Sequence, residues 1–173
     1  MPLLDRDGVR LYYEVHGQGP VILLSHGYSA TAQMWRGQIA ALSRQHTLVT
    51  WDMRGHGGSD SPDDAAAYSA EATIADMAAL LDAVGAQRAI VGGLSLGGYM
   101  SLMFHARHPQ RVRALLILDT GPGFRKDEAR EGWNQRARET AQRFETDGPA
   151  RLAALKEPLT GNTHRSAQGL AHA

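Results

Sequence analysis

Short apolar runs alternate with amphipathic helical patterns along most of this chain, and the alternation constrains its fold more than any other feature. Four runs are almost continuously apolar, as strands buried on both faces of a sheet are. They span residues 21–25, 47–51, 89–91 and 114–118. Between them, apolar residues recur three or four positions apart, which is typical of packed helices. This order predicts right-handed crossovers, and therefore an α/β fold with a mostly parallel sheet flanked by helices.

Two further patterns extend this scheme toward the amino terminus and into the loops. Residues 9–16 alternate apolar and polar side chains with period two, which predicts a half-exposed strand at an antiparallel edge of the sheet. Ser69 is expected to cap the helix that carries Ile74 and Leu81, and Gly85 to end it. Polar motifs then fall at the carboxyl ends of the predicted strands, where α/β sheets place functional groups.

The alternation of strand and helix patterns ends after Gly123. Residues 125–145 are rich in charge, with Trp133 and Phe144 on an apolar stripe, and predict an amphipathic helix outside the strand–helix alternation. A second short helical pattern covers residues 149–156. We therefore predict a core at residues 1–123 and the beginning of a helical cap at residues 124–173.

A serine between glycines is the strongest candidate for chemistry. Ser95 lies between Gly93 and Gly97, directly after a β-rich run and directly before a helical apolar stripe. This strand, turn and helix order is the context that a nucleophile elbow requires. A strained turn of this kind tolerates only small residues two positions away on either side, and it lifts the hydroxyl out of the sheet. We therefore predict that Ser95 is a nucleophile.

Composition narrows the possible partners. The 173 residues carry 18 Lys and Arg against 18 Asp and Glu, so no broad basic field is available for nucleic acid or anionic membranes. The absence of cysteine excludes disulfides and thiolate chemistry, and no apolar leader or membrane-length run is found. No His, Asp or Glu cluster has metal-ligand spacing. We expect a cytoplasmic protein with a small-molecule substrate and no cofactor, metal, nucleic acid or membrane partner.

The loop after the 21–25 run supplies the expected partners of Ser95. If the two strands are neighbours, the main-chain N–H groups of Tyr28 and Leu96 would form an oxyanion hole, a pair of donors for a negatively charged oxygen. We interpret His26 and Gly27 as support for this loop, because a ring that fixes the loop by hydrogen bonds is the simpler role for that histidine. The charged, glycine-rich turn at residues 52–60 is interpreted as architectural.

Taken together, His26-Gly27, the turn at 52–60 and the Gly93-Leu94-Ser95-Leu96-Gly97-Gly98 segment resemble the α/β-hydrolase superfamily in order and spacing. The resemblance implies a mostly parallel eight-stranded sheet, a cap after the sixth strand and a triad in the chain order Ser, acid, His. It also implies that a serine, rather than the aspartate of dehalogenases and epoxide hydrolases, favours esterases, lactonases and thioesterases. The sequence is then expected to be the amino-terminal part of the fold, ending within the cap.

The acid and histidine that the resemblance implies have no clear counterpart in the chain. Asp119 follows the sixth strand and is either the acid or a turn residue. His105 and His108 lie too far along the helix after Ser95 to reach back to it. His164 and His172 fall in a tail with no assigned structure. A chain of this extent is therefore expected to have low activity alone.

Three kinds of function are compared with the sequence motifs. The first is a serine hydrolase of small carboxylic esters or lactones that works through an acyl-enzyme, and the alternative is a non-catalytic small-ligand binding protein in which Ser95 only donates a hydrogen bond. Nucleotide binding is disfavoured because neither a G-x-G-x-x-G motif nor a Walker lysine is found. The sixth strand is also expected to form an open apolar sheet edge, which predicts self-association.

Overall fold

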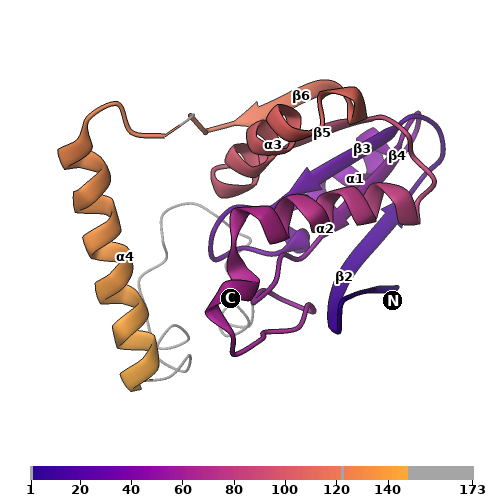
Figure 1. Cartoon of the computed structure of the whole chain (residues 1–173). Helices are drawn as coiled ribbons and strands as arrows, with labels where there is room; N and C mark the ends of the chain where they lie inside the picture. The colour runs from indigo at the N-terminus through magenta and orange to yellow at the C-terminus, as the bar shows by residue number, and fades with distance from the viewer. Residues whose placement is uncertain (1, 122, 148–173) are drawn as a thin grey trace.

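The computed structural model describes residues 2–121 and 123–147 and shows a six-stranded sheet in the order β1-β2-β4-β3-β5-β6 (Figure 1). The strands are β1 Leu3–Arg6, β2 Val9–His16, β3 Val21–Ser25, β4 Thr47–Trp51, β5 Ala89–Leu94 and β6 Val112–Leu118. The four neighbouring strands β4, β3, β5 and β6 are parallel, which confirms the predicted sheet. Because β3 and β5 are hydrogen-bonded neighbours, the loops that follow them lie side by side.

The prediction that residues 9–16 form an edge strand is wrong. β2 is antiparallel, as expected, but it lies between β4 and β1. The added strand β1 folds back on β2 through a tight turn in which Asp7 and Gly8 both have positive φ, at 54° and 83°. An Asp-Gly pair between two short extended runs is the typical signal of such a hairpin, and it identifies β1 once it is noticed.

Helices cover both faces of the sheet. The longer ones are α1 Arg36–Leu42, α2 Ala70–Ala83, α3 Leu96–Arg107 and α4 Asp127–Asp147, and the short 3-10 turns are η1 Ala32–Trp35, η2 Ala65–Tyr68 and η3 Pro109–Arg111. The Ser69 hydroxyl accepts a hydrogen bond from the N–H of Ala72, and Gly85 has φ of 68°, so the predicted cap and stop of α2 are confirmed.

Two apolar clusters hold these layers together. One lies between the sheet and helices α2 and α3, and includes Met77, Leu81 and Phe104, all fully buried. The other lies under η1 and α1, where Trp35 packs on Leu48. Since strands β3 and β4 contribute to both clusters, their side chains are buried on both faces, which explains why they are apolar almost without a break.

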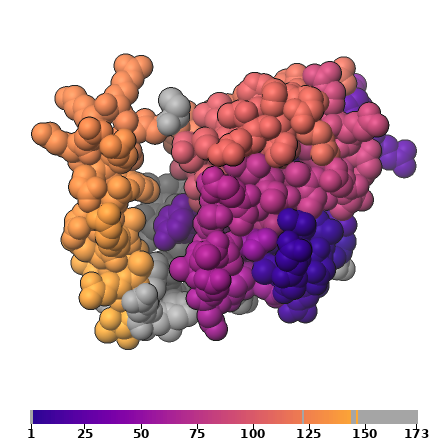
Figure 2. Space-filling model, viewed as in Figure 1, coloured from indigo at the N-terminus to yellow at the C-terminus, as the bar shows by residue number. Residues whose placement is uncertain are grey.

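The helix predicted after Gly123 is present as α4. It stands to one side of the sheet (Figure 1) and forms a separate column in the space-filling view (Figure 2). Phe124 and Trp133 are both about half exposed, and their ring centroids lie 6.1 Å apart. The helical pattern at 149–156, like His164 and His172, lies outside the described residues. In the part of the chain that the structure describes, no helix is long and apolar enough to cross a membrane.

β6 is the edge strand of the described sheet and carries exposed apolar side chains. Within the described residues this strand pairs with β5 alone, and Leu116 and Leu118 are 40% and 42% exposed. Unpaired strand edges with apolar side chains are templates for association with another chain. The exposed edge strand is the surface through which self-association is predicted, and that association stays a prediction.

Candidate active site

Ser95 lies at the tip of the turn between β5 and α3. Its backbone adopts φ 50° and ψ −112°, a conformation that costs roughly 1–3 kcal/mol for a residue with a side chain. The residue is exposed, and its side chain makes no hydrogen bond within the described residues. A strained, exposed and unpartnered hydroxyl is the arrangement that a nucleophile elbow produces.

The glycines around Ser95 are required by close backbone contacts. A Cβ on Gly97 would lie 2.3 Å from the carbonyl oxygen of Ser25 and 2.5 Å from that of His26. A Cβ on Gly93 would lie 2.5 Å from the Gly97 carbonyl carbon and from the Ser25 oxygen. Real side chains never approach the backbone this closely, so the first turn of α3 can pack against the end of β3 only without them.

The end of β6 clamps the backbone of Ser95 on both sides. The Ser95 N–H donates to the carbonyl oxygen of Leu118 at 3.0 Å, and the Thr120 hydroxyl donates to the Ser95 carbonyl oxygen at 2.6 Å. Thr120 was not singled out in the sequence. Its signal is its position: it follows the strand next to β5 at the same edge of the sheet, where side chains meet those at the end of β5.

The loop after β3 lies against the serine turn. A Cβ on Gly27 would be 3.7 Å from the Cβ of Ser95. The loop turns at Ser29, where φ is 58°, and is closed by a hydrogen bond from the Ala30 N–H to the Gly27 carbonyl oxygen at 3.1 Å. Within residues 2–121 and 123–147, the N–H groups of Tyr28 and Leu96 donate to no acceptor. Two main-chain donors are thus available on neighbouring loops beside Ser95.

His26 is fully buried behind this loop and uses both ring nitrogens. Its Nδ1 donates to the Gly27 carbonyl oxygen at 2.7 Å, and its Nε2 accepts from the Met53 N–H at 2.9 Å. Burial, with a smaller contribution from nearby His56, lowers the pKa of His26 to about 3. The ring is therefore neutral, and it links the loop after β3 to the loop after β4 without contacting the serine hydroxyl.

Asp52 begins the loop after β4 and organises two segments. Its carboxylate accepts from the Ala32 N–H at 2.6 Å and from the Gly58 N–H at 2.8 Å. Burial raises its pKa, although both hydrogen bonds favour the ionised form. Gly57 has no room for a side chain, because a Cβ there would lie 2.1 Å from the same carboxylate. Asp52 therefore holds this loop against η1 and acts on the architecture of the site.

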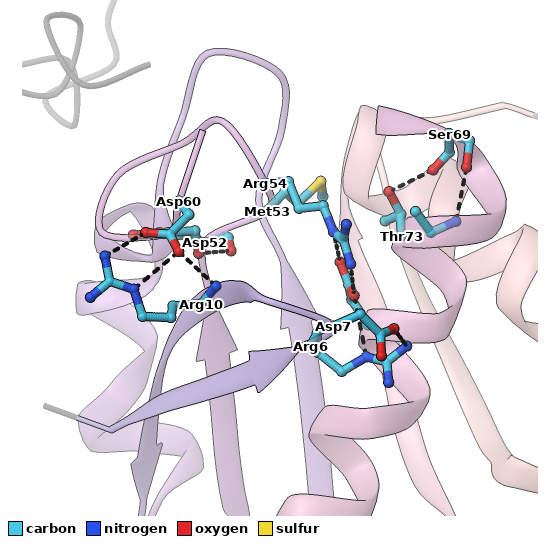
Figure 3. Close-up of polar contacts among 12 residues, drawn as sticks. Arg6, Asp7, Arg10, Asp52, Met53, Arg54, Asp60, Ser69 and Thr73 are labelled. Carbon is cyan, nitrogen blue, oxygen red and sulfur yellow. Dashed lines mark hydrogen bonds and ion pairs between the residues drawn. The ribbon is translucent and has the colours of Figure 1, made fainter. Parts of the chain in front are cut away.

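Ion pairs fasten the rest of the 52–60 loop to the body of the protein (Figure 3). Arg54 binds Asp76 of α2 with two hydrogen bonds of 2.7 and 2.8 Å, and Asp76 is buried. Arg10 of β2 binds Asp60 through its side chain and its main-chain N–H. These contacts fit the architectural interpretation of this turn.

Among the described residues, no acid or base forms a hydrogen bond with the Ser95 hydroxyl. Asp119 is exposed, has φ of 46° and makes no side-chain hydrogen bond there, which fits a turn residue. His108 packs on the ring of Phe104 near the far end of α3, and His105 is exposed on the same turn, about 15 Å of helix from Ser95. In residues 2–121 and 123–147, no three His, Asp or Glu side chains lie close enough to share a metal ion.

Comparison with known proteins identifies the family. The model of the alpha/beta hydrolase fold matches residues 20–166, which is most of the chain. The six-stranded mixed sheet flanked by helices agrees with that assignment. The chain belongs to the α/β-hydrolase family.

Relatives within the family differ in the reactions that their names describe. The chain is 39% identical over 119 residues to a putative carbamate hydrolase, RutD, of Azorhizobium caulinodans, covering 69% of this chain and 44% of that protein. It is 34% identical to bifunctional epoxide hydrolase 2 of Sus scrofa, covering 68% of this chain and 21% of that protein. A solved carboxylesterase structure from Nitrososphaera gargenis superposes with a TM-score of 0.78 at 23% identity, covering 98% of this chain and 65% of that one. The chain thus spans less than half the length of these two curated relatives.

Proposed function

We propose that the protein is a serine hydrolase that acts on a small carboxylic ester or lactone through an acyl-enzyme. Ser95 attacks the carbonyl carbon, and the N–H groups of Tyr28 and Leu96 bind the oxygen that becomes negatively charged. The observation that carries the proposal is the exposed Ser95 hydroxyl beside two main-chain donors without acceptors in the described residues. One such donor contributes about 3–4 kcal/mol of transition-state stabilisation in serine hydrolases.

The serine itself favours acyl transfer over epoxide opening. The resemblance outlined above associates an aspartate nucleophile with epoxide hydrolases, and this chain has Ser95 at that turn. A serine ester is readily hydrolysed by a second attack of water, which completes the cycle. Ser95 must lose its proton to a base, and no described imidazole forms a hydrogen bond with it, so the base is assigned to a residue outside those that the structure describes. The acid partner is either Asp119 or a residue outside them.

The remaining parts of the proposal concern surroundings and partners. Residues 124–173 begin a cap over the site, and the substrate is a small molecule because the balanced charge offers no field for nucleic acid. The edge of β6 allows association with a second chain. The cytoplasm is the proposed compartment, since a cysteine-free sequence has no need of an oxidising one.

Turnover of matched substrates tests the reaction class. A p-nitrophenyl acyl ester, a small lactone, a carbamate and an epoxide are each incubated with the protein and with Ser95→Ala, and product is followed by absorbance or chromatography. We expect hydrolysis of the ester and the lactone that the Ser95→Ala variant loses. Turnover of the epoxide alone, or ester turnover that survives Ser95→Ala, would overturn the proposal. Binding of the ester without any turnover would favour the non-catalytic alternative.

A further inference from the structure

The candidate oxyanion loop is defined here as residues 26–30. His56 lies behind this loop, and its role in the 52–60 turn does not require that position. Its ring contacts two rings of that loop. The centroid of the His26 ring is 4.8 Å away with the planes tilted by 51°, and that of Tyr28 is 6.3 Å away in an edge-on arrangement of 77°. One imidazole from the loop after β4 therefore contacts the rings on both sides of Gly27 in the loop after β3.

The orientation of the His56 ring is fixed from its own loop. Nδ1 lies 3.0 Å from the Arg54 carbonyl oxygen and donates to it, which leaves Nε2 as an unprotonated acceptor. That Nε2 is buried and has no hydrogen-bond partner in the described residues. A ring that keeps a buried acceptor unpaired costs stability, since such groups normally find a donor. Its ring contacts with the oxyanion loop offer a reason for its presence.

Hydrogen bonds hold the oxyanion loop at its ends and at one internal carbonyl group. At one end His26 accepts from the Met53 N–H at 2.9 Å. Just beyond the other end, the Ala32 N–H donates to Asp52 at 2.6 Å. Between these anchors the Gly27 carbonyl oxygen accepts from His26 Nδ1 at 2.7 Å and from the Ala30 N–H at 3.1 Å. This oxygen belongs to the same peptide unit as the Tyr28 N–H, the candidate donor, so the direction of that N–H depends on the position of the His26 ring that His56 contacts.

We propose that His56 is a positioning residue: its ring, packed against those of His26 and Tyr28, holds the Tyr28 peptide where its N–H can bind a developing oxyanion. The inference rests on the proposed function for the meaning of that N–H, but the positioning itself is a physical property of the folded chain. Tyr28 is 55% exposed, so little else packs on its side chain, and the edge-on contact with His56 restrains the side chain of the residue whose N–H is the candidate donor. An aromatic ring is effective here because flat rings lose little conformational entropy on packing.

The direct test measures the mobility of the Tyr28 N–H by nitrogen-15 relaxation in the full chain. His56→Ala removes the ring, His56→Leu fills its volume without a ring, and His56→Phe keeps the ring. His105→Ala, an exposed histidine on α3, is the matched control. We expect the order parameter of the Tyr28 N–H to fall clearly below the rigid value of about 0.85 in the alanine and leucine variants and to stay rigid in the phenylalanine variant.

Each result decides the proposal. A Tyr28 N–H that stays rigid in both His56→Ala and His56→Leu, or one as mobile in His56→Phe as in those variants, would overturn it. If His56→Ala does not fold, the leucine variant carries the test. Relaxation needs no chemistry at Ser95, so an inactive serine would refute the proposed function and leave this result standing. Where turnover is measurable, kcat should fall at least tenfold in His56→Ala with KM unchanged, because the Tyr28 N–H binds the oxyanion only in the transition state.

Discussion

Gly97→Ala tests the packing that creates the serine turn. The added methyl group would lie 2.3 Å from the Ser25 carbonyl oxygen and 2.5 Å from that of His26, and ordinary contacts need more than 3.0 Å. Neither oxygen belongs to a flexible side chain, so α3 or the end of β3 must shift by about an ångström. Overpacking of this kind costs typically about 1–3 kcal/mol. The same shift moves the Leu96 N–H away from the Ser95 hydroxyl.

The assay pairs urea unfolding with the rate at which a fluorophosphonate labels Ser95. Gly37→Ala is the matched control, because it lies in helix α1 and a Cβ there would meet nothing within 4 Å. We expect Gly97→Ala to lose about 1–3 kcal/mol and at least tenfold in labelling, and Gly37→Ala to gain up to about 1 kcal/mol from helix propensity. A Gly97→Ala variant as stable and as reactive as the parent protein would refute the close packing of α3 on β3.

Three further predictions follow from single contacts. Thr120→Val removes the hydroxyl that binds the Ser95 carbonyl oxygen, so it should lower the free energy of unfolding by about 1 kcal/mol and also slow labelling of Ser95. The control Thr47→Val loses a similar bond to a carbonyl oxygen at 3.0 Å and should lower the free energy of unfolding without slowing labelling. Equal labelling rates in the two variants would contradict the clamp. The pKa of His26 is about 3 in the folded chain and near 6.5 in the unfolded chain, so its contribution to stability is full above pH 6.5 and falls toward pH 3 by up to about 1.4 kcal/mol per pH unit. The urea midpoint of His26→Gln should therefore change less with pH between 6.5 and 4.5 than that of the parent chain, and an equal change in both would be contrary evidence. Leu116→Lys places a charge on the exposed edge of β6, so sedimentation should show less association than in the parent chain, and identical profiles would exclude this edge as the contact.

The parallel part of the sheet was predictable because its signals are local. Each strand from β3 to β6 is a short apolar run, and Ser69 and Gly85 mark the ends of α2 by their own backbone and side-chain chemistry. The hairpin at Asp7-Gly8 also has a local signal, and it is this hairpin that places β1 outside residues 9–16. The elbow glycines were predictable, since a strained turn excludes side chains whatever surrounds it.

Contacts between distant segments could not be predicted in the same way. Thr120 reaches Ser95 only because β6 pairs with β5, and the contacts of His56 with His26 and Tyr28 exist only because β3 and β4 are neighbours. The pair of Arg54 and Asp76 joins a loop to a helix in the same manner. Charged and aromatic residues have many possible partners in a sequence, and the fold selects among them.

The turn at Ser95 and its two main-chain donors are expected to make this hydroxyl more reactive than any ordinary serine. Selective labelling measures that claim, with the folded chain exposed to a fluorophosphonate and the adduct located by mass spectrometry, and with exposed Ser61 as the internal comparison. An oxyanion hole and binding alone accelerate acyl chemistry by roughly 10³–10⁴, so Ser95 should be labelled far ahead of Ser61, and urea should abolish the difference. Equal labelling of the two serines in the folded chain, or a preference for Ser95 that persists in urea, would contradict the account.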